Sequence, residues 1–323
     1  MKKRTLILLL VLVALLAGTY YFVSRPDRKT TLNAAETNFA VTDTAAITRV
    51  FLSSKSGESN LLERQPNNTW LLDKKYQANQ TMVNLLLETL NRMQVRRPVS
   101  RQARNTVIKT LAAQGTKVEL YTKDGLLKTF YVGGNTSDEK GSHFLMEGAE
   151  EPYVLHIRGF DGYLSSRFAI PENDLRSRQI FASIPPTIQK LQVEYLDVPA
   201  NSFTIKQENG NFVLENAPNA DTAKVKRYLT QFRELHAEML VEDAPQRFTD
   251  SLSLIKPRAV ITLTDANPKN SNRLVIFPNP ADPNRMVARY GEGGKQLATI
   301  QQHVFGNVLI RKSDLLKPEK SGE

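Results

Sequence analysis

Cysteine is absent from this chain of 323 residues. The absence excludes disulfide bonds, a cysteine-based zinc site and a lipid attached to an N-terminal cysteine. The third exclusion matters because residues 15–18 (Leu-Leu-Ala-Gly) resemble the start of a lipoprotein signal, yet Thr19 stands where the lipid-bearing cysteine would be. Attachment to a membrane would therefore have to come from the polypeptide itself.

Histidine is scarce, and its spacing does not indicate a metal centre. The four histidines are His143, His156, His236 and His303. No two of them have the spacing of a helical metal-binding pair, and no cysteine is available to complete a site. We therefore expect no metal and no cofactor, and we interpret the histidines as structural. A catalytic triad assembled across the fold stays open as an alternative.

Two groups of glycines invite a phosphate-loop interpretation but lack its pattern. They are Gly133, Gly134 and Gly141, and then Gly291, Gly293 and Gly294. Neither group ends in Gly-Lys-Ser/Thr or opens an obvious helix after a buried parallel strand. We expect both groups to supply positive φ angles in hairpin turns.

Paired carboxylates are few, and their spacing does not favour acid–base catalysis. The adjacent pairs are Asp138-Glu139, Glu150-Glu151 and Glu242-Asp243. Neighbouring side chains on a strand point to opposite faces, and on a loop they are solvated. The sequence therefore leaves enzymatic activity uncertain and favours a protein that is not an enzyme.

The N-terminus carries the longest apolar stretch, from Thr5 to Val23, with Lys2, Lys3 and Arg4 before it. As a helix, these residues match the roughly 30 Å hydrocarbon core of a bilayer. A cleaved signal peptide would have a shorter apolar core of about 7 to 15 residues. We therefore predict an uncleaved signal-anchor over residues 1–29, with residues 5–23 in the membrane.

Orientation and charge limit the partners of the remaining body. A short N-terminal tail usually stays inside, which predicts a single-pass protein of the inner (cytoplasmic) membrane with its body on the periplasmic or extracytoplasmic side. Residues 1–29 hold six bases and one acid, which is half of the net charge of +10. The body is thus only weakly basic, and we expect no nucleic-acid partner.

The body contains an internal repeat with an offset of 142 residues. Trp70-Leu71-Leu72 and the potential cap Asn79 precede an apolar stripe at Val83, Leu86, Leu87 and Leu90. The second copy has Phe212-Val213-Leu214, the potential cap Asp221, and the stripe Val225, Tyr228, Leu229 and Phe232. Spacings of three and four residues place each stripe on one face of a capped helix. We predict a duplicated unit.

Alternating apolar and polar residues predict strands before and after each helix. The fold class that follows is α+β: an N-terminal transmembrane helix and two tandem repeats of mainly antiparallel sheet packed with a helix. We expect a linker over residues 30–46, a first repeat over 47–180 and a second over 187–318, joined near Phe181 to Pro186 where Pro185-Pro186 breaks regular structure.

The anchor, the strand with Trp70, the capped helix to Met93 and the turn at residues 130–134 (Phe-Tyr-Val-Gly-Gly) together resemble the bacterial domain-of-unknown-function family 4340. The resemblance covers most of residues 1–320, and its motifs are structural. It implies no active site. Members are encoded near ABC-type transporter components of the envelope, some related to gliding motility, which implies an accessory role by association.

A run of bases without acids follows the first predicted helix as a basic connector. Its arginines are Arg92, Arg96, Arg97, Arg101 and Arg104. The simpler interpretation is a solvated helix edge and loop. The functional interpretation is a contact with anionic lipid or an acidic partner, because each base near a charged membrane contributes about 1 kcal/mol.

These observations favour a non-enzymatic, membrane-tethered envelope protein that binds another protein, within an ABC-type transporter or surface-assembly complex. The competing hypothesis is an envelope hydrolase, or a carbohydrate- or ligand-binding protein, with a site between the repeats. Convergent carboxylates or histidines in a deep cleft would favour the hydrolase. An apolar pocket would favour a ligand-binding sensor.

Overall fold

The computed structural model describes residues 34–318, apart from residues 56 and 243. The predicted membrane helix over residues 5–23 lies outside these residues. In the part of the chain that the structure describes, no helix is long and apolar enough to cross a membrane.

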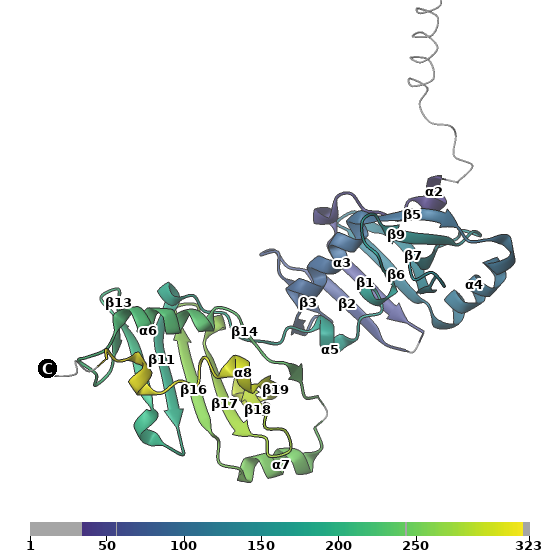
Figure 1. Ribbon diagram of the computed structural model, residues 1–323. Helices are drawn as coiled ribbons and strands as arrows, with labels where there is room; N and C mark the ends of the chain where they lie inside the picture. Colours follow the sequence, from purple (N-terminus) through teal and green to yellow (C-terminus); the bar gives the residue numbers. More distant parts are fainter. Residues whose placement is uncertain (1–33, 56, 243, 319–323) are drawn as a thin grey trace, which may run out of the picture. The chain divides into compact units, whose positions relative to one another are not determined.

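The body divides into two compact units, with the change between Leu175 and Arg176. Each unit contains one large antiparallel sheet with helices packed against it, so the predicted α+β class is confirmed (Figure 1). Each unit also has its own apolar core between the sheet and a helix.

The first sheet has the order β4-β3-β2-β1-β6-β7-β8-β9-β5. Its strands are β1 (Arg49–Ser54), β2 (Ser59–Arg64), β3 (Trp70–Leu72), β4 (Tyr76–Gln77), β5 (Met93–Pro98), β6 (Thr116–Thr122), β7 (Gly125–Asn135), β8 (Ser142–Met146) and β9 (Tyr153–Ile157). All neighbouring strands are antiparallel. The helices of this unit are α2 (Ala34–Thr37), α3 (Gln80–Arg92), α4 (Arg101–Gln114) and α5 (Glu172–Leu175).

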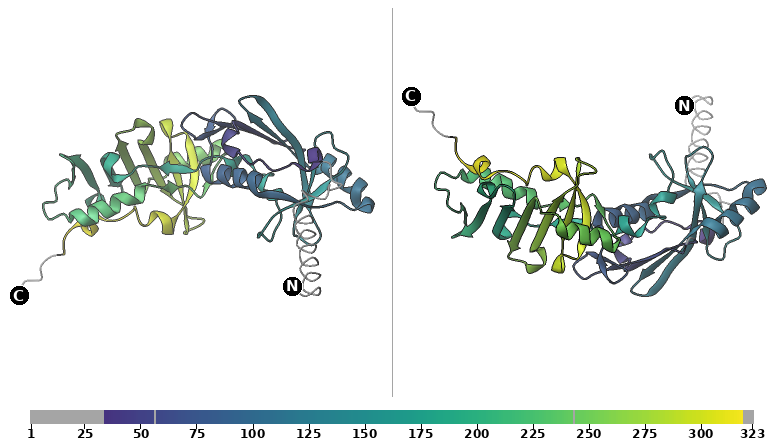
Figure 2. Two further views of the ribbon diagram at one scale, coloured as in Figure 1. Left: turned by 90° about the horizontal axis from the view of Figure 1, so that it is seen from above. Right: turned by 90° about the horizontal axis from the view of Figure 1, so that it is seen from below.

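Helix α3 covers one face of this sheet, as the apolar stripe predicts (Figures 1 and 2). The side chain of Asn79 accepts hydrogen bonds from the N–H groups of Thr81 and Met82, so the predicted cap is confirmed. Val83, Leu86 and Leu90 are fully buried. A capped helix with one apolar face therefore forms the lid of the first core.

The second sheet has the order β13-β12-β11-β16-β17-β18-β19-β15. Its strands are β11 (Ile188–Tyr195), β12 (Phe203–Glu208), β13 (Asn211–Leu214), β15 (Met239–Leu240), β16 (Ala259–Asp265), β17 (Asn272–Pro278), β18 (Arg285–Tyr290) and β19 (Gln296–Gln301), and a separate pair is formed by β10 (Gln179–Phe181) and β14 (Leu235–His236). The helices are α6 (Thr222–Leu229), α7 (Gln246–Leu254) and α8 (Gln302–Phe305). Helix α6 covers the inner face, capped by the side chain of Asp221 as predicted.

The eight strands of the second sheet follow the same order as eight strands of the first, from β3 to β5. The additional strand of the first sheet, β4, pairs Tyr76 with Leu72. At the offset of 142 residues, Pro218 stands in place of Tyr76. Proline has no N–H to donate to a ladder. This difference explains why the edge strand β13 has no counterpart of β4.

The prediction of a linker over residues 30–46 is wrong for its described C-terminal part. Phe39 and Val41 are buried in the first core, and the Phe39 ring packs edge-on against Phe130 and Phe144, with ring centroids 5.9 and 5.8 Å apart. The Val41 N–H donates to the Leu90 carbonyl oxygen across 2.9 Å. Two apolar side chains with a spacing of two residues outweigh the polar composition around them.

The junction between the units lies before the segment expected from Pro185-Pro186. Ile180 and Phe181 are buried in the second core, and the Phe181 ring stacks edge-on against Phe232 at 5.4 Å. The two prolines open a short 3-10 turn, Pro185–Thr187, that leads into β11. They break regular structure inside the second unit rather than between the units.

Candidate binding groove on the outer face of the second sheet

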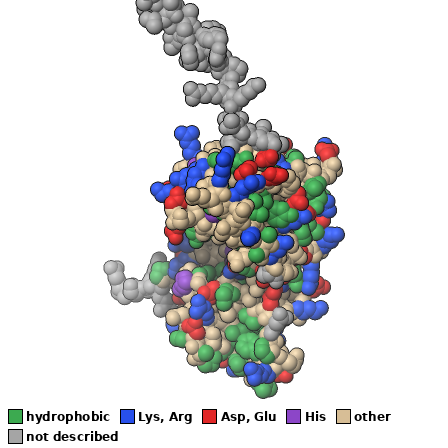
Figure 3. Space-filling view, turned by 90° about the vertical axis from the view of Figure 1, so that its right-hand side faces the viewer, with side chains coloured by type: hydrophobic (Ala, Val, Ile, Leu, Met, Phe, Trp, Pro, Cys, Tyr) green, Lys and Arg blue, Asp and Glu red, His purple; other side chains and the backbone are tan. Residues whose placement is uncertain are grey.

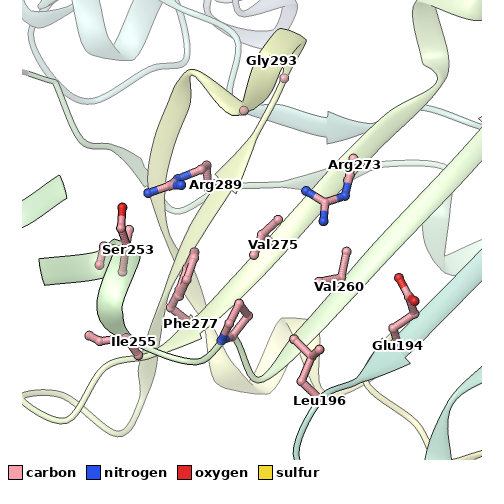
Figure 4. A pocket seen from close by; sticks show the side chains of 14 residues that line it. Glu194, Leu196, Ser253, Ile255, Val260, Arg273, Val275, Phe277, Arg289 and Gly293 are labelled. Carbon is pink, nitrogen blue, oxygen red and sulfur yellow. The ribbon is translucent and has the colours of Figure 1, made fainter. Parts of the chain in front are cut away.

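An open groove lies on the face of the second sheet that α6 does not cover. Its volume is about 780 Å³, which is within the range of ligand sites in proteins, about 300 to 1,000 Å³. Strands β11, β16, β17 and β18 form its floor, and α7 with the turn after it forms one wall (Figure 4). The turn at Gly291–Gly294 closes one end.

One row of paired residues runs straight across the floor of the groove. Glu194 of β11 pairs with Val260, Val260 with Val275, and Val275 with Arg289 of β18. Paired residues on neighbouring strands point to the same face, so the row has an acid at one end, two valines in the middle and a base at the other end. The two charged positions are three strand intervals apart, roughly 14 Å. At this separation Glu194 and Arg289 do not form an ion pair.

A second arginine projects from the same face of the sheet. Arg273 is two residues before Val275 on β17 and so faces the same side of the sheet. In Figure 4, Arg273 and Arg289 lie on the Gly293 side of Val275. Arg273 is exposed and Arg289 is half-buried, and neither forms an ion pair with a residue of the described chain. The Arg289 guanidinium lies over the Phe277 ring, 5.6 Å from its centroid.

The groove exists because α7 leaves much of this face uncovered. In the first unit, α4 packs across β7 and β8, and its side chains Val107 and Leu111 form an apolar cluster with Val154 of β9. Gly133 of β7 allows this approach, since a Cβ atom there would lie 2.7 Å from Leu111 Cδ2. In the second unit α7 has nine residues against fourteen in α4.

Phe277 occupies the place in β17 that Gly133 occupies in β7. In the first sheet Phe130 of β7 pairs with Val118, and in the second sheet Leu274 of β17 pairs with Ile261. Gly133 lies three residues after Phe130, and Phe277 lies three residues after Leu274. The Phe277 side chain packs with Leu252 of α7 and Val287. A ring at this position fills the space that Gly133 leaves to α4.

The predicted basic connector is not a loop, and most of its arginines have partners. It forms the end of α3, strand β5 and the start of α4. Ion pairs join Arg92 to Glu88 at 2.6 Å, Arg96 to Asp138 at 3.2 Å, and Arg104 to Glu151 at 3.3 Å. Arg97 and Arg101 are exposed and have no ion pair within the described residues. Glu88 is one helical turn before Arg92, whereas the partners of Arg96 and Arg104 are distant along the chain and could not be indicated by the sequence.

The surface charge is mixed. On the face that Figure 3 shows, Lys and Arg side chains are interspersed with Asp and Glu side chains. Contact of the arginine group with anionic lipid stays a prediction that rests on Arg97 and Arg101.

The structure does not bring the histidines together into a candidate site. Within the described residues, no group of three His, Asp or Glu side chains is arranged to hold a metal ion. His143 Nδ1 donates to the Gly134 carbonyl oxygen across 3.1 Å, and burial lowers its pKa. Burial also lowers the pKa of His236.

The acidic pairs have structural partners as well. Asp138 accepts a hydrogen bond from the Thr136 hydroxyl, which is the main reason that its pKa is lowered. Glu150 and Glu151 both contact Arg104, and Glu242 forms an ion pair with Arg176. Residue 243 lies outside the described residues.

The turn prediction holds for one glycine group and is wrong for the other. Gly291, Gly293 and Gly294 have positive φ angles in the turn between β18 and β19. Gly133 and Gly134 instead lie inside β7, and neither they nor Gly141 has a positive φ angle. Close packing explains two of the three: a Cβ atom on Gly133 would meet Leu111, and one on Gly141 would lie 2.7 Å from the Leu155 carbonyl oxygen.

Sequence reasoning did not identify the groove, although one signal was present. Residues 274–277 of β17 are four consecutive apolar residues, which predicts a strand with apolar side chains on both faces and therefore a second apolar face on this sheet. The flanking Arg273 and the paired Arg289 lie on different strands, so their proximity depends on strand register.

The fold and the groove define a two-unit α+β protein with an open groove that is lined by charged and apolar residues. The chain belongs to the family described as domain of unknown function DUF4340, whose sequence model matches residues 70–257. The match begins at β3 in the first unit and ends after α7 in the second. No curated protein and no protein of solved structure matches the chain.

Proposed function

We propose that this protein is a non-enzymatic, membrane-tethered accessory protein of the bacterial envelope that binds another protein. The groove on the second sheet is the observation that carries the proposal. It offers an apolar floor of Val260, Val275 and Phe277 with charged groups at its ends. A partly apolar surface with a charged rim is typical of protein-binding sites.

The apolar stretch over residues 5–23 supports the tether, because its length matches a bilayer and bases precede it. The body then lies on the periplasmic or extracytoplasmic side of the inner membrane. The resemblance to proteins encoded near ABC-type transporters supports a partner in a transporter or surface-assembly complex. The shared order of eight strands supports an origin of the two units by duplication.

Crosslinking from solubilised membranes tests both parts of this proposal. The full chain is compared with a form that lacks residues 1–29, and captured proteins are identified by mass spectrometry. The full chain is expected in the membrane fraction, together with a reproducible envelope or transporter partner. The shortened form is expected in the soluble fraction and is expected to capture less of that partner. A shortened form that stays in the membrane fraction contradicts the tether. Capture of no partner by either form contradicts the accessory role.

A further inference from the structure

We propose that the groove on the second sheet binds an extended segment of the partner protein, with carboxylates at one end and apolar side chains behind them. The carboxylates contact Arg273 and Arg289, and the apolar side chains lie on Val260 and Val275. This inference rests on the proposed function and adds the chemistry of the partner.

Charge complementarity indicates the acidic end. Arg289 pairs with Val275 and Arg273 lies two residues before Val275, so both arginines flank this valine on one face of the sheet, and neither has an ion pair with the described residues. Guanidinium groups bind carboxylates with two parallel hydrogen bonds, and neither of these two arginines has such a partner in the described residues. A pair of carboxylates therefore gains more at this end of the groove than any neutral group.

The floor indicates apolar side chains next to the acids. Val260, Val275 and Phe277 are 5%, 8% and 4% exposed, so their remaining surface lies at the bottom of the groove. The half-buried Ile255 adds a further apolar side chain on the wall. Apolar side chains of a partner that reach this floor lose contact with water at both surfaces.

Glu194, at the other end of the groove, determines which charge the segment carries there. Glu194 is exposed on the same row as Arg289, roughly 14 Å away. An extended chain advances about 3.3 Å per residue, so about four residues span the two ends. Glu194 repels a second acidic group and favours a basic or neutral residue there. The recognised pattern is thus acidic, then apolar, then basic or neutral.

A peptide selection tests this pattern without knowledge of the partner. The full chain in lipid nanodiscs is used to select from a library of random 12-residue peptides displayed on phage, with empty nanodiscs as the background. Enriched peptides are expected to carry one or two carboxylates directly next to apolar residues, on either side of them in the sequence. Their affinity is then measured by fluorescence anisotropy.

Paired variants identify the groove as the binding site. The double variant Arg273→Glu/Arg289→Glu is expected to weaken binding by about tenfold or more. The matched control Lys123→Glu/Arg158→Glu reverses two exposed charges in the first unit that belong to no proposed contact, and it is expected to leave binding unchanged. A peptide whose acids are replaced by lysine is expected to bind the groove variant better than it binds the original protein.

Three results overturn the inference: enrichment of no peptide, enrichment of peptides without carboxylates, or equal binding by the groove variant and the original protein. The crosslinking experiment with the groove variant separates the two proposals. If the variant still captures the membrane partner, the proposed function stands and the groove assignment falls. If the original protein captures no partner but binds acidic peptides through the groove, the groove assignment stands and the accessory role falls.

Discussion

The backbone N–H of Asn79 donates a hydrogen bond to the carbonyl oxygen of Leu175 across 2.7 Å. The second unit repeats this bond between Asp221 and Leu315 across 2.9 Å. In both units the helix cap is thereby tied to a fully buried leucine near the end of the unit. The side chain of each cap residue also accepts from the first turn of its helix. One residue therefore joins the helix start to the closing segment in each unit.

The alanine variants Asn79→Ala and Asp221→Ala are expected to lower the free energy of unfolding by about 1 kcal/mol each, because loss of an N-cap acceptor leaves helix N–H groups without a partner. Asn79→Ala is expected to cost more than Asp221→Ala, since the Asn79 side chain also donates to the Asp174 carbonyl oxygen across 3.2 Å. Urea unfolding followed by circular dichroism measures both changes.

Asp221→Asn is the control for the second cap, because it keeps the capping oxygen. Asn79→Asp also keeps that oxygen but loses the donor to the Asp174 carbonyl oxygen, so it is expected to recover only part of the stability that Asn79→Ala loses. The double alanine variant is expected to show the sum of the two single effects, because the caps lie in separate compact units. An alanine variant as stable as its conservative control would contradict the capping role.

Replacement of Trp70 by alanine is expected to lower the free energy of unfolding by about 3 to 5 kcal/mol, because the side chain is fully buried in the first core. The guanidinium of Arg64 also lies over the indole, 4.6 Å from the ring centroid. Trp70→Phe is expected to cost less than Trp70→Ala, since the indole N–H has no hydrogen-bond partner in the described residues. Circular dichroism during urea unfolding measures the change, with exposed Leu126→Ala as the control.

Local patterns in the sequence were sufficient to predict the core of each unit, in which α3 or α6 packs against one face of the sheet. The helix stripes and their caps depend on neighbours within a few residues. Strands with alternating burial, such as β6 and β11, were predicted for the same reason. The spacing of apolar residues determines which face is buried once the secondary structure is known.

The elements outside these two cores could not be predicted, because their positions depend on contacts between residues that are distant along the chain. Strand β5 is a basic segment at the sheet edge, and its register with β9 is interrupted between Val95 and Arg97. Helix α4 presents only Val107 and Leu111 as buried residues, which is a weak apolar stripe. The groove requires the register of β17 against β18 and the ring of Phe277 beneath α7. Neither relation is visible in a single stretch of sequence.

Replacement of His143 by glutamine is expected to reduce the pH dependence of stability. Burial lowers the pKa of His143 below its ordinary 6.5, so the unfolded chain takes up a proton more readily than the folded one. The stability that the neutral ring contributes is therefore fully present above about pH 6.5 and is lost as the pH falls toward the lowered pKa. Melting temperatures at about pH 7.5 and about pH 5 measure this loss.

The glutamine variant keeps a donor for the Gly134 carbonyl oxygen but has no titratable ring. The difference between the two melting temperatures is expected to shrink in this variant. The control Leu126→Ala replaces an exposed side chain that does not titrate, and it is expected to leave the difference as it is in the original protein. Equal pH dependence in the His143 variant and the original protein contradicts the role of this ring.

Two neighbouring glycines of β7 test how closely α4 packs on the first sheet. Gly133→Ala is expected to lower the free energy of unfolding by about 1 to 3 kcal/mol, because the new methyl group would lie 2.7 Å from Leu111 Cδ2 in a packed cluster. Gly134→Ala is the matched control: its Cβ atom would meet nothing within 4 Å. Alanine restricts the unfolded chain more than glycine does, so this control is expected to be neutral or slightly stabilising. Urea unfolding measures both variants.

Leu111→Ala combined with Gly133→Ala is expected to cost less than the sum of the two single changes, since the shortened side chain removes the clash. Strict additivity of the two changes would show that Leu111 does not need the absence of a side chain at residue 133. The explanation that Gly133 lets α4 cover the first sheet, while Phe277 at the matching place holds α7 away from the second, would then be wrong.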